Sequence, residues 1–411
     1  MLATFAWGAQ SPLDKFLNAP ERGLPETKVT KNGTTYEIEF CSQKWQNTLW
    51  SHRVLLLVPK GAEKSKTAIL YITGDGPKKG DYVDLNLLSG ATGMPIAMLF
   101  NIPNQPLWDM KEDDLIAHTF EKYLATGDDT WPLLFPMTKS AVVSMNVVQK
   151  VAKQNGLALD KFVVTGASKR GWTTWLTAAS GDKRIAGIAP MVFDNLKFDA
   201  QMQKQMGDWG KYSEQIEDYT RRGLQAKLAT KEGAELMRMV DPYSYRDKIK
   251  VPTLIVNGTN DPYWTVNSTL VYWDDLKQSK WLLEVPNSGH GLEDKGRVVS
   301  TVGAFARSLA GQFKMPKLEA RMATDKDHNT VKFSIDAGSK DVTQVSVWKA
   351  ESMTKDFRGS KWVESKQEKN VQPEIGFNPN AKNAIFVEVK YTIGGKSFTL
   401  STPIQIVPTA E

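Results

Sequence analysis

The chain has 411 residues, of which 41% are hydrophobic and 24% charged, an ordinary globular composition for which two domains are expected. The net charge of +6 is scattered without basic blocks, which argues against a nucleic-acid surface, and no apolar run is long enough to span a membrane. The single cysteine, Cys41, excludes an internal disulfide, and no phosphate-binding loop or Cys/His metal spacing occurs, so we expect neither a cofactor nor a metal.

The first ten residues are small and apolar and resemble the end of a secretory signal. They lack a basic leader and a full apolar core, so a loose N-terminus is the alternative interpretation. A signal here would make the protein secreted or periplasmic.

The next elements follow the alternation of an α/β protein. Strands are predicted at 35–40, 54–58 and 67–72. The last of these strands runs into a loop at 73–77 whose glycines allow the backbone to turn an amide inward. A helix near 82–88, a buried strand at 95–100 and a helical region over about 115–155 come next.

The most informative stretch is 162–171, where a β-branched run meets Gly166, Ala167 and Ser168 and then a predicted helix. Such a strand–turn–helix exposes a nucleophilic serine at the edge of a sheet and aims helix amides at the same place. Arg170 occupies the position where this motif usually has a second glycine. An ordinary helix N-cap is the alternative interpretation of the serine.

Two later loops supply the partners that such a serine needs, in the order Ser, Asp, His. Asp261 follows a buried strand at 252–258, and His290 follows a strand at 281–286 in a glycine-flanked loop. Asp261 could instead be a simple turn residue before a proline. Asp194, at the end of the strand 185–193, is the alternative acid.

These residue types predict a catalytic triad with a defined chemistry. His290 would take the proton of Ser168, and Asp261 would orient the imidazole and stabilise its charged form. The oxyanion that forms needs donors, each typically worth about 3 kcal/mol. We expect one to be the amide of Lys169 and the other to be the amide of Gly74 or Asp75.

The rest of the chain departs from this alternation twice. Residues 195–250 are polar and helical and are too long for an ordinary crossover, which indicates a lid insertion. After a linker at 314–316, short alternating strands predict an antiparallel β-sandwich. The predicted domains are therefore an α/β-hydrolase domain at 10–313, with a mostly parallel twisted sheet, and an immunoglobulin-like sandwich at 317–411.

Several motifs together resemble the PhoPQ-activated pathogenicity-related protein family. They lie at residues 42–45, 50–52, 72–76, 104–107, 112–117, 126–132, 136–139 and 166–172. The resemblance covers about 10–410 and implies an α/β-hydrolase domain distantly like prolyl-oligopeptidase-type enzymes, export from the cytoplasm, and the triad Ser168, Asp261 and His290. The family's loop often has a second glycine where Asp75 stands, which leaves the second oxyanion donor open.

Three functions remain for the chain. The first is an exported serine hydrolase that acts on a small peptide or ester substrate through an acyl-enzyme. The second is a secreted binding or signalling protein, virulence-associated in some relatives, whose C-terminal domain contacts a protein or glycan partner. The third is a carbohydrate esterase, which exposed tryptophans at Trp348 and Trp362 would favour.

Overall fold

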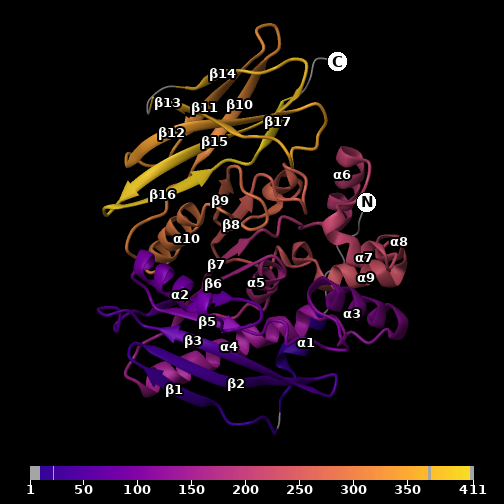
Figure 1. Ribbon diagram of the computed structural model, residues 1–411, viewed down its shortest axis with the longest axis vertical. Coiled ribbons are helices and arrows are strands. Elements are labelled where there is room, and N and C mark those ends of the chain that lie inside the picture. Colours follow the sequence, from indigo (N-terminus) through magenta and orange to yellow (C-terminus); the bar gives the residue numbers. More distant parts are fainter. Residues whose placement is uncertain (1–9, 22, 369–371, 408–411) are drawn as a thin grey trace. The chain divides into compact units, whose positions relative to one another are not determined.

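The computed structural model describes residues 10–21, 23–368 and 372–407 (Figure 1). The predicted signal-like segment lies outside these residues except for Gln10. The chain divides into two compact units. The first contains residues up to Ser89, Met94–Ala186 and Glu217–Ile249, and the second contains Gly90–Gly93, Gly187–Ile216 and Lys250–Glu411.

The first unit is built on a sheet with the strand order β1-β2-β3-β5-β4-β6. Pairs from β1 to β5 are antiparallel, whereas β4 runs parallel to both β5 and β6. The strands β3 to β6 are rich in fully buried aliphatic residues, as expected for strands covered on both faces. Their bounds are β1 (Lys28–Asn32), β2 (Thr35–Trp45), β3 (Thr48–Leu57), β4 (Thr67–Ile72), β5 (Ile96–Phe100) and β6 (Lys161–Ala167).

The β2–β3 hairpin is longer than the strands predicted at 35–40 and 54–58. Its turn consists of Gln46 and Asn47, which both have positive φ angles, 45° and 62°. Two-residue hairpin turns of this kind match the strand twist but are usually marked by glycine. The hairpin was missed because neither turn residue is glycine.

Helices surround the sheet of the first unit. Helix α4 packs on β2, β3 and β5, and α5 packs on β6 and α4. The predicted helical region at 115–155 is two helices, because Gly127 ends α3 in the left-handed conformation and Pro132 precedes α4. The helices are α1 (Pro12–Asn18), α2 (Lys79–Thr92), which reaches into the second unit, α3 (Glu112–Thr126), α4 (Leu134–Gln154), α5 (Lys169–Ala179), α7 (Glu217–Thr220), α8 (Leu224–Lys227), α9 (Lys231–Val240) and η2 (Pro242–Tyr245).

The second unit contains the parallel strands β7, β8 and β9, with α10 packed on β8 and β9. Its remaining helical elements follow β7 and β8. The elements are β7 (Ile185–Met191), whose first two residues belong to the first unit, α6 (Phe198–Trp209), η1 (Glu214–Ile216), β8 (Thr253–Gly258), η3 (Ser268–Val271), η4 (Trp273–Asp275), β9 (Lys280–Val285) and α10 (Lys295–Leu309).

The end of the second unit is antiparallel, as predicted. One sheet has the order β10-β11-β14, and the other has the order β13-β12-β15-β16 with β17 also paired to β15. The strands are β10 (Glu319–Asp325), β11 (Thr330–Asp336), β12 (Val342–Ser352), β13 (Val363–Gln367), β14 (Glu374–Gly376), β15 (Lys382–Ile393), β16 (Lys396–Ser401) and β17 (Gln405–Val407).

These observations confirm the predicted fold class. Helices accompany mostly parallel strands, a helical insertion stands between β7 and β8, and antiparallel sheets end the chain. The boundary proposed at 313–317 falls inside the second compact unit and stays a prediction. Within the described residues, no helix has the length and apolar character needed to cross a membrane.

Candidate active site

Ser168 stands at a sharp turn between β6 and α5. Its backbone has φ 59° and ψ −128°, a conformation that turns normally reserve for glycine. The residue is half-buried, and α5 begins directly after it. A strained, non-glycine residue at a strand-to-helix turn is the geometry that presents a nucleophilic serine.

The turn is tight because β6 and α5 nearly touch. A Cβ atom at Gly166 would lie 2.8 Å from the backbone oxygen of Arg170 and 2.9 Å from its Cβ. Since both are atoms of the helix itself, the strand can approach this closely only with glycine at 166. The first glycine of the motif therefore has a packing role, while Arg170 at the second position points its side chain elsewhere.

The loop after β4 lies beside this turn, because Ile72 pairs with Gly166 across the two parallel strands. The carbonyls of Thr73 and Gly74 accept hydrogen bonds from Ile102 and Asn101, which follow β5. A trans peptide holds its C=O and N–H on opposite sides, so the amides of Gly74 and Asp75 point away from β5. They face the side of β4 on which β6 ends in Ser168.

Lys169 is the first residue of α5, so its backbone N–H has no acceptor within the helix and can donate to a substrate. Lys169, Gly74 and Asp75 are thus placed on adjacent strand ends of one unit. The role of Lys169 as an oxyanion donor, with Gly74 or Asp75 as the second donor, stays a prediction.

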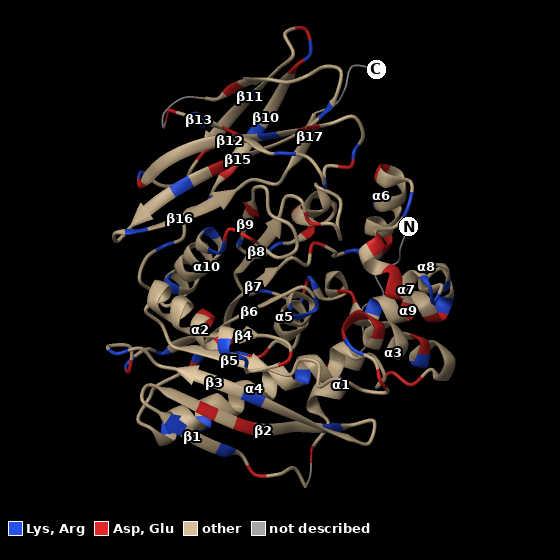
Figure 2. Cartoon of the chain, in the orientation of Figure 1, with Lys and Arg blue, Asp and Glu red and all other residues tan. Residues whose placement is uncertain are grey.

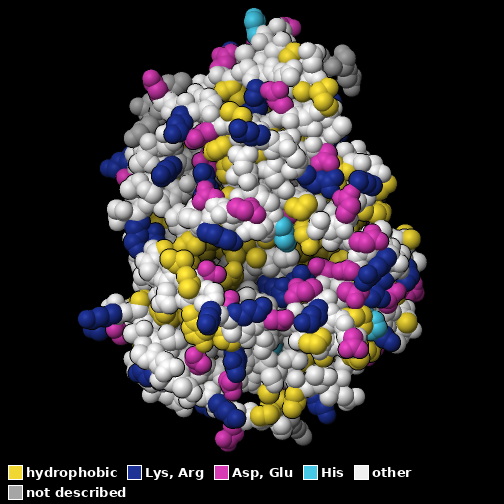
Figure 3. Space-filling model, viewed as in Figure 1, with side chains coloured by type: hydrophobic (Ala, Val, Ile, Leu, Met, Phe, Trp, Pro, Cys, Tyr) yellow, Lys and Arg dark blue, Asp and Glu magenta, His cyan; other side chains and the backbone are white. Residues whose placement is uncertain are grey.

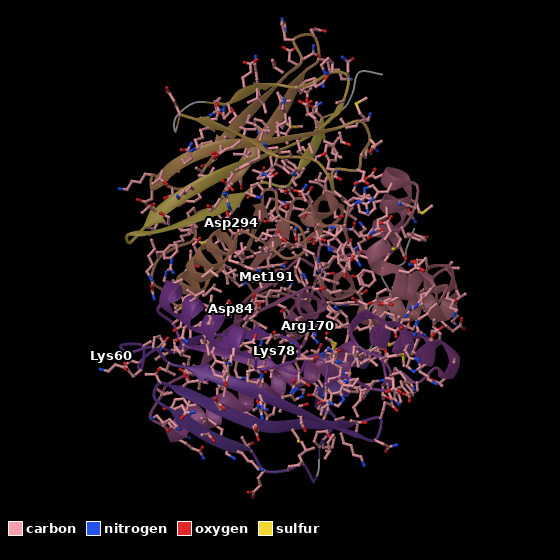
Figure 4. The ribbon with its side chains drawn as sticks, in the orientation of Figure 1. Lys60, Lys78, Asp84, Arg170, Met191 and Asp294 are labelled. Atoms are coloured by element: carbon pink, nitrogen blue, oxygen red, sulfur yellow. The ribbon has the colours of Figure 1, made fainter. Side chains whose placement is uncertain are left out.

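Arg170 ties the loop after β4 to α3. Its guanidinium donates to both carboxylate oxygens of Glu112 at 2.7 and 2.6 Å and to the carbonyl of Ile102 at 2.6 Å. A side chain at Gly74 would meet Nη2 of Arg170 at 2.7 Å, so the guanidinium lies directly against that glycine. Figure 4 labels Arg170 on this unit.

Glu112 is the centre of this charged cluster. Lys169 Nζ lies 2.8 Å from Glu112 and 3.0 Å from Asp113. Burial alone would raise the pKa of Glu112, but the hydrogen bonds and charge of Arg170, together with Lys169, lower it to about 2. Both cations next to the serine are therefore already paired with carboxylates. Figure 2 shows acidic residues gathered at α3 and its surroundings.

Asp261 and His290 lie together in the second unit. His290 Nδ1 is 2.8 Å from Asp261 Oδ2, and because a carboxylate only accepts, Nδ1 carries the proton. The other carboxylate oxygen accepts from the backbone N–H of Tyr263 at 2.9 Å, whose ring stacks on His290 at 4.1 Å. The opposite nitrogen, Nε2, is buried and has no hydrogen-bond partner among the described residues.

The acid loop and the base loop are also joined through their backbones. Asn260 N–H donates to the carbonyl of Ser288 at 2.9 Å, and Asn287 N–H donates to Thr259 Oγ1 at 3.0 Å. A Cβ at Gly258 would lie 2.3 Å from the carbonyl oxygen of Gly289. The loops are held at a separation that only glycine at 258 permits.

Asp194, the alternative acid, has other partners. It is buried, and its carboxylate accepts hydrogen bonds from Tyr272 and, at 2.8 Å, from Thr269. Burial raises the pKa of Asp194 to about 7, against the lowering effect of those hydrogen bonds. Burial also raises the pKa of nearby Glu284 well above its usual range. A cavity of about 10 Å³ touches Asp194, Glu284 and Asp261.

Comparison with known proteins identifies the family. The model of the PhoPQ-activated pathogenicity-related proteins matches residues 18–358. The chain belongs to this family. Autocrine proliferation repressor protein A of Dictyostelium discoideum is 32% identical over 377 residues, which are 85% of this chain and 76% of that protein.

The similar solved structures share less of their sequence with this chain. Acetyl xylan esterase 1 from Thermoanaerobacterium sp. superimposes with a TM-score of 0.50 at 15% identity, over 74% of this chain and 92% of the esterase. The acylaminoacyl peptidase of Pyrococcus horikoshii gives a TM-score of 0.48 at 12% identity, over 69% of this chain and 43% of the peptidase. At such identities the esterase shows the α/β-hydrolase fold and nothing finer.

Two features of the family site were missed from the sequence. The ion pairs of Lys169 and Arg170 with Glu112 had no local sequence signal, although residues 112–117 and 166–172 both carry the family resemblance. The ring of Tyr263 on His290 had no sequence signal, since residues 27 positions apart make contact only through the loop geometry.

Proposed function

We propose that this family member is an exported serine hydrolase with Ser168 as nucleophile, His290 as general base and Asp261 as the orienting acid. In acylation, Ser168 Oγ attacks the substrate carbonyl while His290 Nε2 takes the hydroxyl proton and then gives it to the leaving group. In deacylation, water attacks the acyl-enzyme with the same proton transfers through His290, which releases the acid and restores Ser168. The amides of Lys169 and of Gly74 or Asp75 stabilise the oxyanion in both steps.

The backbone of Ser168 is the observation that carries the proposal. A φ of 59° with ψ −128° costs a serine about 1–3 kcal/mol, which is retained only where the surrounding structure enforces it. A structural serine at a helix N-cap would avoid this strain and accept a hydrogen bond from the first turn, but Ser168 makes no such cap bond. His290, oriented by Asp261 with Nε2 unused, supplies the matching base in its own unit.

A fluorophosphonate probe tests the nucleophile directly. We expect the wild-type protein to be labelled and Ser168→Ala to be unlabelled, with His290→Ala labelled far more slowly because the base is missing. Peptide mapping should place the adduct on Ser168. A folded wild-type sample that stays unlabelled would refute the proposal.

The substrate class follows from a second measurement. Short p-nitrophenyl esters should be compared with aminoacyl and dipeptidyl coumarins, using Ser168→Ala as control. A peptide ammonium would need a carboxylate such as Glu214, Glu217 or Asp218, and two of these are paired, Glu214 with Lys211 and Arg358 and Asp218 with Arg221. These pairs favour an ester over a peptide with a free N-terminus.

A secreted signalling protein is the second candidate function. It is favoured by the 32% identity to a protein named as an autocrine proliferation repressor. In that case the hydrolase scaffold would bind a partner with little or no turnover. A wild-type protein that is folded, resists the probe and still reproduces growth repression when added to cells would favour this function.

The carbohydrate-esterase alternative has lost its sequence support. Trp348 and Trp362 were expected to be exposed if they bind sugar, yet their exposed fractions are 9% and 1%. Both pack in a core cluster with Phe357 and Phe386. They stabilise the C-terminal sheet and present no aromatic platform for a glycan.

A further inference from the structure

The loop between β12 and β13 reaches the acid loop of the same unit. We call residues 356–362 the clasp loop. Asn260, directly before Asp261, donates from Nδ2 to three carbonyls of the clasp loop: Ser360 at 2.7 Å, Arg358 at 3.1 Å and Phe357 at 3.3 Å. One side-chain amide thus gathers three backbone acceptors of a segment about a hundred residues away in sequence.

The clasp loop holds the base loop in the same way. Asn287, three residues before His290, donates from Nδ2 to the carbonyl of Trp362 at 3.0 Å. The N–H of Trp362 donates back to Asn287 Oδ1 at 2.8 Å. This reciprocal pair resembles one step of a β ladder and fixes both the position and the rotation of the asparagine.

The clasp loop is itself well anchored. Phe357 and Trp362 are each 1% exposed and belong to the aromatic cluster of the C-terminal sheet. Arg358 pairs with Asp356 at 2.6 Å, and its guanidinium lies 4.1 Å from the ring of Trp209 in α6. Because the clasp loop is fixed at Phe357, Arg358 and Trp362, it can hold Asn260 and Asn287 in defined positions.

The two asparagines are joined to each other as well as to the clasp loop. Thr259 Oγ1 donates to Asn260 Oδ1 at 2.9 Å and accepts from the N–H of Asn287 at 3.0 Å. A continuous set of hydrogen bonds therefore links the clasp loop, both asparagines and the two loops that end in Asp261 and His290.

We propose that the clasp loop sets the alignment of Asp261 with His290, and that Asn260 and Asn287 are positioning residues for this pair. The hydrogen bonds within the second unit support this alignment, and its catalytic meaning rests on the proposed hydrolase function. A hydrogen-bonded pair loses its short contact when one loop shifts, and a displacement of about 1 Å can lower a rate about a hundredfold.

The sharpest variant is Asn260→Asp, which keeps the shape but replaces the donor by a carboxylate facing three carbonyl oxygens. Asn287→Ala removes both bonds to Trp362 and provides an independent test if the first variant does not fold. Asn378→Ala is the matched control, because the side chain of Asn378 bonds within the C-terminal region, where it donates to Glu351 and accepts from the N–H of Asn380.

We expect kcat for an activated ester to fall at least about tenfold in Asn260→Asp and Asn287→Ala, with KM within about twofold and Asn378→Ala like the wild type. Proton NMR gives a readout that needs no turnover. The far-downfield Nδ1–H resonance of His290, assigned with His290→Ala, should be present in the wild type and in Asn378→Ala and should broaden or vanish in the two loop variants.

Wild-type kcat and an unchanged resonance in both loop variants would overturn the proposal. So would a loss of kcat that leaves the resonance intact, or an equal loss in Asn378→Ala. If the wild type shows the resonance but no hydrolysis of any ester or amide, the hydrolase function fails while the change of resonance still decides the positioning role.

Discussion

Ser168 has a strained backbone and a hydroxyl with a proposed catalytic role, and substitutions can test these two properties separately. Ser168→Gly removes the side chain at a φ of 59°, whereas Ser168→Ala keeps a Cβ there. We expect the glycine variant to be more stable than the alanine variant by about 1 kcal/mol, because relief of about 1–3 kcal/mol of strain exceeds glycine's entropic cost of about 0.4–1 kcal/mol. Both should be inactive.

Urea denaturation of the two variants measures this difference. Ser180 is the matched control, since it ends the same helix with φ −59° and ψ −25°. There the order should reverse, with alanine more stable than glycine by about 0.5–1 kcal/mol. Equal midpoints for Ser168→Gly and Ser168→Ala would show that the turn is not strained.

Asp194 should give the protein a pH-dependent cost in stability. Its pKa is raised to about 7 in the folded state from an ordinary value of 3.8, so folding favours its protonated form. The stability that it contributes is full below about pH 4 and is lost as pH rises through about 7. Asp194→Asn cannot ionise, so the free energy of unfolding of the wild type relative to this variant should fall between pH 4 and pH 7.5.

Chemical denaturation of both proteins at pH 4.5, 6 and 7.5 tests this sign. The difference between the two proteins matters, because titrating groups that do not interact with Asp194 cancel in it. A wild type that gains stability over Asp194→Asn as pH rises would mean that Asp194 is ionised in the folded protein.

At the scale of elements, the packing of β6 against α5 depends on one glycine. Gly166→Ala would place a Cβ 2.8 Å from the carbonyl oxygen of Arg170, where neither backbone can yield without moving the serine turn. We expect a loss of about 1–3 kcal/mol in stability and a large loss of probe labelling. Gly90→Ala in α2 has open space and should be neutral or slightly stabilising in the same denaturation assay.

Labelling that survives in Gly166→Ala at the wild-type rate would contradict this account of the turn. It would mean that the helix shifts without disturbing Ser168. The control separates this steric effect from the general effect of adding a methyl group to the chain.

The elements of the fold were largely predictable because buried parallel strands are continuous apolar runs bounded by turn residues. The strands that precede Ser168, Asp261 and His290 all form, as β6, β8 and β9. The sequence also predicted the antiparallel end of the chain from its alternating residues. These features are local, so they can be recognised without knowing which segments meet.

What the sequence could not predict depends on contacts between distant segments. The clasp loop meets Asn260 and Asn287 through side-chain amides, and asparagine in a loop is ordinarily a turn former. The pairing of Arg170 with Glu112 was likewise hidden, since a charged residue at a helix start is usually solvated. The Asp261–His290 pair was predicted only because its order along the chain is typical of one fold.

At the scale of the whole molecule, Figure 3 shows basic and acidic side chains mixed over the visible face, so the charge pattern of that face marks no binding surface. The second unit is held together by buried contacts between its parallel and antiparallel parts. Thr301 on α10 exchanges hydrogen bonds with the backbone of Thr399 on β16, both at 3.2 Å. Ser401 Oγ accepts from the N–H of Glu284 on β9 at 3.1 Å.

Such contacts predict that β9, α10 and β16 unfold as one cooperative unit. Thr301→Val leaves the N–H of Thr399 without its partner in a buried position, which should cost about 1–3 kcal/mol. Native-state hydrogen exchange should show this loss equally in the slowest amides of α10 and of β16, because the two open together. Thr343→Val, whose hydroxyl bonds on an exposed strand, should change stability by less than about 0.5 kcal/mol. If β16 loses protection in Thr301→Val while α10 keeps it, the antiparallel end opens independently of α10 and the two do not form one cooperative unit.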